Sequence, residues 1–153
     1  MLPFRAPPSS SDHGFTLIEL LIALVVLAVL AAVALPAFNE SIRKSRRSEA
    51  AAAITGVQQA QERWRSNNTS YAASVAALSL PTTSSGGYYT ISVDSATTTG
   101  YNVVATAVAG KSQAEDGDCV RLRVRSVGGS LVYGSAAASG SFDESAGNRC
   151  WSR

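Results

Sequence analysis

A lone carboxylate lies inside an apolar run near the start of the chain. Glu19 closes the sequence GFTLIE that begins at Gly14, and the apolar character continues from there to Phe38. An acidic side chain near the middle of a bilayer costs roughly 2.5–3.5 kcal/mol, so a carboxylate in a membrane helix is a functional candidate by default. A positive amine one helical turn away would lie on the same helix face and neutralise it. The alternative is that Glu19 is exposed near a membrane surface.

Three arginines alternate with apolar residues late in the chain: Arg121, Arg123 and Arg125. On a strand their side chains would point to one side, roughly 6–7 Å apart, which is close to the spacing of successive phosphates along one nucleic-acid strand. The formal net charge is only +2, so a nucleic-acid contact would have to rest on such a local patch. A DNA contact is one interpretation of these arginines. A solvated face or a contact with another subunit is the other.

Nothing in the sequence indicates catalysis or a bound cofactor. The only histidine, His13, precedes the apolar run, and no phosphate-binding loop or nucleophile elbow is present. The acidic run at residues 115–118 offers oxygen ligands of the kind that calcium prefers, but it lacks the spacing of a calcium-binding loop. We therefore expect no enzyme activity, no catalytic residue, no cofactor and no metal site.

The apolar run is long enough to cross a membrane. From Phe15 to Phe38 it has 24 residues, interrupted only by Thr16, Glu19 and Pro36. A helix of that length spans about 36 Å. A secretory signal has its small-residue cleavage site after the apolar core, whereas here the small residue comes before the core. Cleavage at that point would remove a polar leader and keep the hydrophobic helix.

This order of leader, glycine and apolar run with an early glutamate resembles the processing site of type IV pilins and the related pseudopilins. The resemblance implies that a prepilin peptidase cuts between Gly14 and Phe15, that Phe15 becomes a methylated amino terminus, and that Glu19 is needed for filament assembly. Pro36 matches a proline that bends the helix in many type IV pilins. The leader departs from the family pattern because it ends in Ser-Asp-His rather than in basic residues.

The same resemblance implies the partners and the location of the chain. The partners are other pilin subunits, the prepilin peptidase and the inner-membrane pilus assembly machinery, and the membrane is the environment before assembly. The chain would first be a single-pass inner-membrane protein with a periplasmic C-terminal domain, and then part of the extracellular filament. We expect a leader at residues 1–14, a membrane and filament-core helix at 15–38, and a globular domain at 39–153.

The pattern beyond the apolar run predicts more helix and then a sheet. Apolar residues recur on one helix face to about Arg65. Strands are predicted at residues 88–93, 101–108, 119–125 and 130–133. Such a succession favours an antiparallel meander, whose third strand would turn Val120, Leu122 and Val124 toward the helix. The predicted fold is α+β, the type IV pilin fold, with a long N-terminal helix packed on a four-stranded antiparallel sheet.

A basic cluster follows the apolar run at residues 43–47. The positive-inside rule alone would place it in the cytoplasm, whereas the pilin resemblance places it outside. On a continuing helix Glu40 lies within reach of Arg43 and Lys44, and Glu49 lies within reach of Arg46, which predicts ion pairs along the helix surface. Contacts with lipid head groups or with a neighbouring subunit's acidic residues are the alternative.

Cys119 and Cys150 are the only cysteines. In an exported chain a small even number favours a disulfide, which would stabilise the fold by roughly 3–4 kcal/mol. The bond would hold residues 134–149, which are mostly Ser, Ala and Gly, and would bring Arg149, Trp151 and Arg153 toward the arginines. A free or metal-binding pair is the alternative.

Together these features predict a structural subunit of a type IV pilus. The chain resembles minor pilins of the PilE-like kind more than major pilins. A major pilin and a type II secretion pseudopilin are alternatives of the same class. A DNA-binding minor pilin that acts as a DNA-uptake receptor is the alternative of a different class, and it would use the arginines at positions 121, 123 and 125.

Overall fold

The computed structural model describes residues 14–151. The leader predicted at residues 1–14, apart from Gly14, lies outside the described residues, and so does Arg153. The chain divides into two compact units, Met1–Phe38 and Asn39–Arg153, and each is described by itself.

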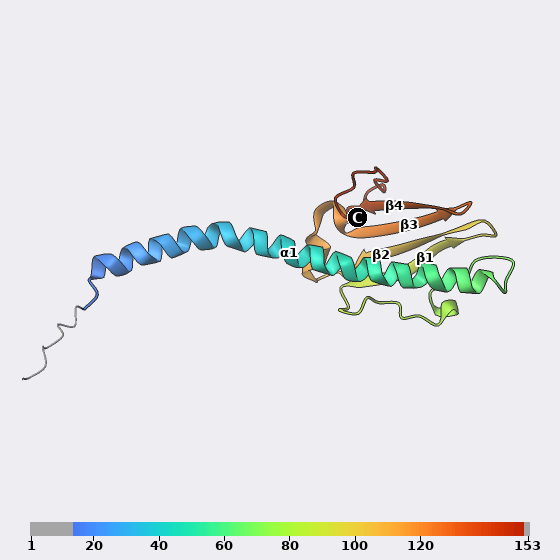
Figure 1. The fold of residues 1–153 in the computed structure, drawn as a ribbon, viewed down its shortest axis with the longest axis horizontal. Coiled ribbons are helices and arrows are strands. Elements are labelled where there is room, and N and C mark those ends of the chain that lie inside the picture. The colour runs from blue at the N-terminus through green and yellow to red at the C-terminus, as the bar shows by residue number, and fades with distance from the viewer. Residues whose placement is uncertain (1–13, 152–153) are drawn as a thin grey trace, which may run out of the picture. The chain divides into compact units, whose positions relative to one another are not determined.

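One long helix, α1, runs over Leu17–Arg65, so it begins two residues later than the apolar run (Figure 1). Thr16 caps its start, because the Glu19 backbone N–H donates to the Thr16 hydroxyl at 3.3 Å. Pro36 lies inside the helix. Apolar side chains between Phe15 and Phe38 are exposed, and this part of α1 is long and apolar enough to cross a membrane.

The four strands form one antiparallel sheet in the order β1-β2-β3-β4, which confirms the predicted meander. The strands are β1 (Tyr89–Ala96), β2 (Gly100–Ala107), β3 (Arg121–Val127) and β4 (Ser130–Ala136) (Figure 1). Short 3-10 turns cover Ala76–Leu78, Ser112–Glu115 and Gly117–Cys119. β1 runs farther than predicted because its register shifts between Val93 and Ser95, which lets the pairing resume beyond the irregularity. β3 begins later than predicted because Cys119 belongs to the last 3-10 turn and Val120 has a helical backbone conformation after it.

The second half of α1 lies across one face of the sheet (Figure 1). Its buried stripe includes Ile54 and Val57, which belong to one core with residues from the sheet. The buried sheet residues include Tyr89, Val103 and Leu122, one from each of the first three strands. For β3 the alternation read from the sequence is confirmed, because Leu122 and Val124 are buried in this core.

A glutamine holds the connection between helix and sheet. Gln61 lies in the buried stripe of α1 and its side chain is fully buried. Its amide N–H donates to the Ala72 carbonyl at 2.8 Å, and its amide oxygen accepts from the Ala72 N–H at 2.8 Å. The amide thus satisfies both polar backbone groups of a buried residue.

Gln61→Leu should lower the free energy of unfolding by about 2–3 kcal/mol, because it leaves the buried Ala72 N–H and carbonyl without partners. Urea unfolding of the detergent-solubilised chain measures this. Gln59→Leu is the matched control, since Gln59 is exposed on the same helix and should change stability little. Equal stability of the two variants would contradict the role given to Gln61.

Candidate functional site

The three alternating arginines lie together on the outer face of the sheet. Along β3 the residues between them are buried on the inner face, while Arg121, Arg123 and Arg125 are half-buried. We call these three residues the arginine ladder. Its side chains share one face, as the strand alternation requires.

The guanidinium groups of the ladder are bound by the chain's own C-terminal segment. Residues 137–150, which we call the tail, supply the partners. Arg121 donates to the carbonyls of Ala137, at 3.0 Å, and of Gly140. Arg123 and Arg125 both pair with Glu144, the latter at 2.7 Å between Nη2 and Oε2. The ladder is therefore not the simple solvated face that sequence reasoning held as one alternative.

An aromatic ring of the tail also lies over the guanidinium groups of the ladder. The Phe142 ring lies 3.9 Å from the Arg123 guanidinium carbon and 4.8 Å from that of Arg121, measured to the ring centroid. Stacking of guanidinium groups on an aromatic face is favourable and keeps their hydrogen-bonding edges open. Phe142 thus supports two arginines without neutralising them.

Small residues on β4 let the tail reach the ladder. Ser135 and Asp143 exchange both backbone hydrogen bonds, at 3.0 and 2.7 Å, so the tail forms an antiparallel bridge beside β4. This register sets Glu144 opposite Gly134, which itself pairs with Arg123 on the other side. A Cβ on Gly134 would stand 3.1 Å from the Glu144 Cγ. Because that Cβ is absent, the Glu144 side chain passes over β4 to the arginines of β3.

The ladder keeps an excess of positive charge. Three guanidinium groups face one carboxylate, that of Glu144. Of the two arginines that pair with Glu144, Arg125 is the more exposed, with 36% of its side chain accessible to solvent against 21% for Arg123. Arg125 also lines a pocket of about 240 Å³ with polar side chains from the β1–β2 turn. The Thr97 hydroxyl there donates to the Gly100 carbonyl at 3.1 Å, and Thr99 is an exposed threonine of the same pocket. Hydroxyl groups beside a guanidinium are suited to binding a phosphate.

The arginines lower the pKa of the Glu144 carboxyl group below its ordinary value of about 4.5. The hydrogen bond from Arg125 is the largest cause, and that from Arg123 acts in the same direction. A lowered folded-state pKa stabilises the fold above the ordinary pKa, and this stabilisation is lost as the pH falls through the folded-state value. The contact between tail and ladder should therefore weaken in acid.

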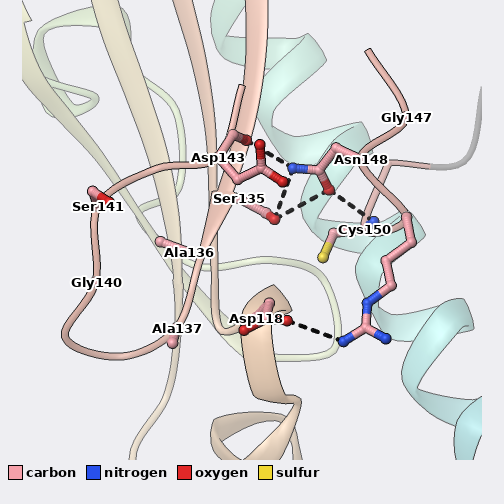
Figure 2. Close-up of a pocket in the computed structure, with 11 residues that line it drawn as sticks. Asp118, Ser135, Ala136, Ala137, Gly140, Ser141, Asp143, Gly147, Asn148 and Cys150 are labelled. Carbon is pink, nitrogen blue, oxygen red and sulfur yellow. Dashed lines mark hydrogen bonds and ion pairs between the residues drawn. The ribbon is translucent and has the colours of Figure 1, made fainter. Parts of the chain in front are cut away.

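The disulfide between Cys119 and Cys150 anchors the end of the tail. Asn148 adds hydrogen bonds from its amide nitrogen to the Asp143 carbonyl, at 2.8 Å, and to the Ser135 hydroxyl, at 2.9 Å (Figure 2). These contacts surround a pocket of about 410 Å³ (Figure 2). The tail is therefore fixed at the bridge, at Asn148 and at the disulfide.

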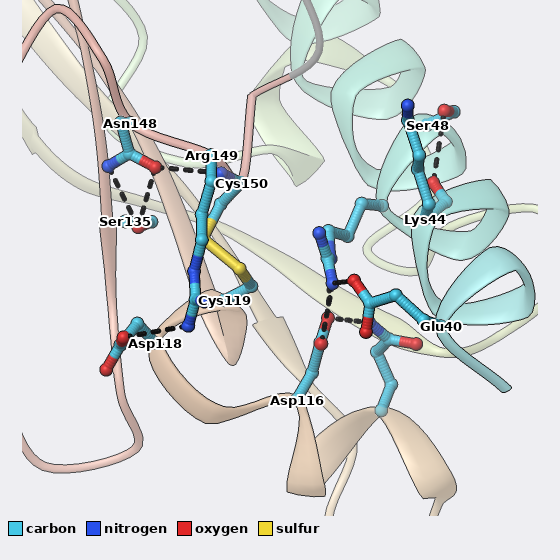
Figure 3. Close-up of polar contacts among 12 residues, drawn as sticks. Glu40, Lys44, Ser48, Asp116, Asp118, Cys119, Ser135, Asn148, Arg149 and Cys150 are labelled. Carbon is cyan, nitrogen blue, oxygen red and sulfur yellow. Dashed lines mark hydrogen bonds and ion pairs between the residues drawn. A yellow bond between two sulfur atoms is a disulfide. The ribbon is translucent and has the colours of Figure 1, made fainter. Parts of the chain in front are cut away.

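Arg149 of the tail and Trp151 after it do not join the ladder. Arg149 pairs with Asp118 at 3.1 Å, and both side chains are largely exposed (Figure 3). Trp151 stacks edge-on against Tyr133 and donates to the Gly134 carbonyl at 3.0 Å. The expectation that Arg149 and Trp151 extend the arginine patch was wrong, because Asp118 in the 3-10 turn before β3 pairs with Arg149, and β4 supplies the partners of Trp151.

Two arginines of the basic cluster of α1, Arg46 and Arg47, serve the fold of the domain. Arg47 is buried and makes two hydrogen bonds to Asp116, at 2.7 and 2.8 Å, and a third to Glu40 at 2.8 Å (Figure 3). The predicted pairing of Glu40 with Arg43 and Lys44 was wrong, because the guanidinium held by buried Asp116 is the stronger partner. The hydrogen bond that Arg47 donates to Asp116 is the main cause of the raised pKa of Arg47.

Arg46 and Glu49 do not pair with each other either. Arg46 lies over the Tyr88 ring, 4.0 Å from its centroid, and donates to the Ser112 hydroxyl. Glu49 accepts from the Gly86 backbone N–H at 2.9 Å. Residues distant in sequence thus displace the ion pairs expected from helix spacing.

The remaining predicted sites lie at the start of the chain. Gly14 and Phe15 precede α1, and Glu19 lies in its first turn. Among residues 14–151 no group of three His, Cys, Asp or Glu side chains is placed to hold a metal ion. Asp116 and Asp118, which sequence reasoning weighed as calcium ligands, bind arginines instead.

Sequence reasoning missed the partners of the ladder. Phe142 and Glu144 are the only aromatic residue and the only glutamate in the segment 137–150. Together with the small residues Gly134 and Ala136 on β4, which lies between, they could have predicted a contact of this segment with the arginines. Because residues 134–149 are mostly Ser, Ala and Gly, we did not expect Phe142 or Glu144 to contact the arginines.

Two family models match the chain. One, described as type IV minor pilin ComP, DNA uptake sequence receptor, matches residues 36–123, which is more than half of the chain. The other, described as a prokaryotic N-terminal methylation motif, matches residues 9–35. No curated protein matches. The first match includes Arg121 and Arg123 and ends before Arg125 and the tail.

Glu144→Gln should lower the melting temperature at neutral pH and have no effect in acid, because protonated Glu144 no longer attracts the arginines. Thermal unfolding of both chains at neutral pH and at about pH 3 measures this. The difference in Tm should be present at the higher pH and shrink toward zero at the lower. A difference of equal size at both would contradict the ion pairs.

Proposed function

The chain belongs to the family of type IV minor pilins described as ComP, DNA uptake sequence receptor, and we propose that it is a filament subunit that binds DNA. The membership places it among minor pilins rather than major pilins or secretion pseudopilins. The helix packed on a four-stranded antiparallel sheet agrees with this family. The proposal has two parts, one for each unit of the chain.

The first unit anchors the subunit and then joins the filament. We propose that the prepilin peptidase removes residues 1–14, that Phe15 is methylated, and that residues 15–38 pass from the inner membrane into the filament core among other pilin subunits. The methylation motif matched at residues 9–35 and the uncovered apolar side chains support this. The domain from residue 39 would then be periplasmic before the pilus assembly machinery incorporates the subunit.

Glu19 sets the position of the subunit in this scheme. Cleavage gives Phe15 a free amine, and Glu19 lies one helical turn away, so it can neutralise that amine within the subunit or on a neighbour. A polar pair within an apolar bundle specifies the axial register even where it adds little stability. Pro36 would bend the helix in this packing.

Glu19→Ala should leave the chain inserted in the membrane and reduce its incorporation into filaments, because the helix becomes more apolar but loses the partner of the Phe15 amine. Quantitative immunoblots of sheared pili and of membranes measure the two pools. Glu62→Ala, which removes an exposed carboxylate of the same helix, should incorporate normally. Normal incorporation of Glu19→Ala would refute the assembly role.

The second unit binds DNA with the arginine ladder. The observation that carries this part is the excess of positive charge on the outer face of β3, where three guanidinium groups face one carboxylate. The exposed Thr99 in the pocket beside Arg125 adds a hydroxyl group that can bind a phosphate. Phosphate contacts of this kind give affinity without reading sequence, so the family's uptake sequence would require additional base contacts.

Replacing all three ladder arginines with glutamine should weaken duplex binding at least about tenfold at low salt and flatten the salt dependence of log K by about 0.7–0.9 per lost phosphate contact. Arg125→Gln alone should give a smaller loss and leave the tail in place. Fluorescence anisotropy at low and moderate salt measures both. Arg63→Gln is the control, since Arg63 is exposed in the last turn of α1 and carries the same charge. Unchanged affinity of the triple variant at both salt concentrations would exclude the ladder.

A further inference from the structure

We propose that the tail competes with DNA for the arginine ladder, with the Glu144 carboxylate occupying the place that a backbone phosphate takes. This inference rests on the DNA binding proposed above. It assigns the phosphate site to the space between Arg123 and Arg125, where both guanidinium groups meet the same carboxylate.

The geometry of Glu144 is that of a bound oxyanion. Its Oε1 accepts from Arg123, and its Oε2 accepts from the Arg125 Nη2 at 2.7 Å, so one group bridges two strand positions on the same face. Carboxylates and phosphates both accept charge-assisted hydrogen bonds from arginine in this manner. A phosphate of DNA thus finds a site already shaped for an anion.

The tail neutralises the positive charge of the ladder only in part. Arg121 receives only neutral partners from the tail, the carbonyls of Ala137 and Gly140. Phe142 supports Arg121 and Arg123 by stacking and brings no charge. A nucleic-acid strand carries a negative charge at every phosphate and can neutralise several arginines at once. DNA therefore gains electrostatic interactions that the tail does not provide.

Displacement of Glu144 needs little movement of the chain. The backbone beside it is held by the bridge between Ser135 and Asp143, and Asn148 binds the Asp143 carbonyl. Rotation about the side-chain bonds of Glu144 is sufficient to vacate the site, and such rotations are fast. The competitor is covalently attached, so it is present at a constant effective concentration and lowers the apparent affinity for every DNA.

The tail also opposes weak or short ligands more than long ones. A ligand with one anionic group must compete with Glu144 on equal terms, whereas a duplex adds contacts at Arg121 and at the pocket beside Arg125. The tail therefore raises the number of simultaneous phosphate contacts that binding requires. We expect the ladder to prefer polymeric DNA over free nucleotides or inorganic phosphate for this reason.

Duplex titrations of the full-length chain in detergent test the competition. Glu144→Gln should raise the affinity roughly three- to tenfold, which corresponds to the loss of two partly exposed ion pairs. Asp143→Asn is the matched control. It removes the same charge one residue away, from a carboxylate that binds Ser145 and not the ladder. Its effect should be less than about twofold.

A second variant displaces the tail without changing any charge. Gly134→Val would place side-chain atoms where Glu144 and Phe142 now cross β4, since even a Cβ there would stand 3.1 and 3.4 Å from them. Its affinity for DNA should also rise. Thermal unfolding of each variant checks that the domain is folded, and limited proteolysis of the tail checks that it is displaced.

The outcomes separate the competition from the DNA interface itself. If Arg125→Gln weakens binding while Glu144→Gln and Gly134→Val leave it unchanged, the competition is refuted and the interface stands. If Asp143→Asn raises the affinity as much as Glu144→Gln does, a general charge effect replaces the competition. If no variant, the triple arginine variant included, changes the affinity, the interface is refuted and the competition with it.

Discussion

The buried ion pair between Arg47 and Asp116 is the contact on which the rest of the domain depends. Both side chains are almost fully buried, and breaking such a pair by removing one partner costs about 3–5 kcal/mol. Asp116 belongs to the connection between β2 and β3, which also carries Cys119. The pair thus positions one half of the disulfide, and the disulfide positions the tail. Arg47 on α1 therefore helps to position the tail on the opposite face of the sheet, through Asp116 and the disulfide.

The amino-acid pattern predicted the elements well and their polar partners poorly. Period and turn residues give the long helix, the meander and the buried face of β3, because each depends on neighbours within one element. The pairing of Glu40 was misjudged because helix spacing treats α1 as isolated, whereas Asp116 reaches Arg47 from far along the chain. The contact of the tail with the arginine ladder was also missed. Glu144 comes from a segment without helical or strand periodicity, so its sequence pattern predicts no partner.

Minor pilin membership and the arginine ladder divide the chain by task. The start of the chain and the apolar part of α1 carry the residues proposed for processing and assembly, and the sheet carries the charge proposed to contact DNA. The matched region ends within β3, so the tail and Arg125 belong to the part of the chain outside the shared pattern. The tail is also the part whose removal from the outer face would change the charge that a ligand meets. Variation in DNA affinity among related subunits would on this view arise in their C-terminal segments.

The small outer residues of β4 have a consequence for sheets in general. Gly134 and Ala136 leave the outer side of this strand low, so side chains of β3 on one side and of the tail on the other contact each other over its backbone. Pairing rules for sheets consider only adjacent strands. A strand whose alternate positions are glycine and alanine extends that range to second neighbours. Coupled substitutions in such a sheet should therefore appear between strands that share no hydrogen bond.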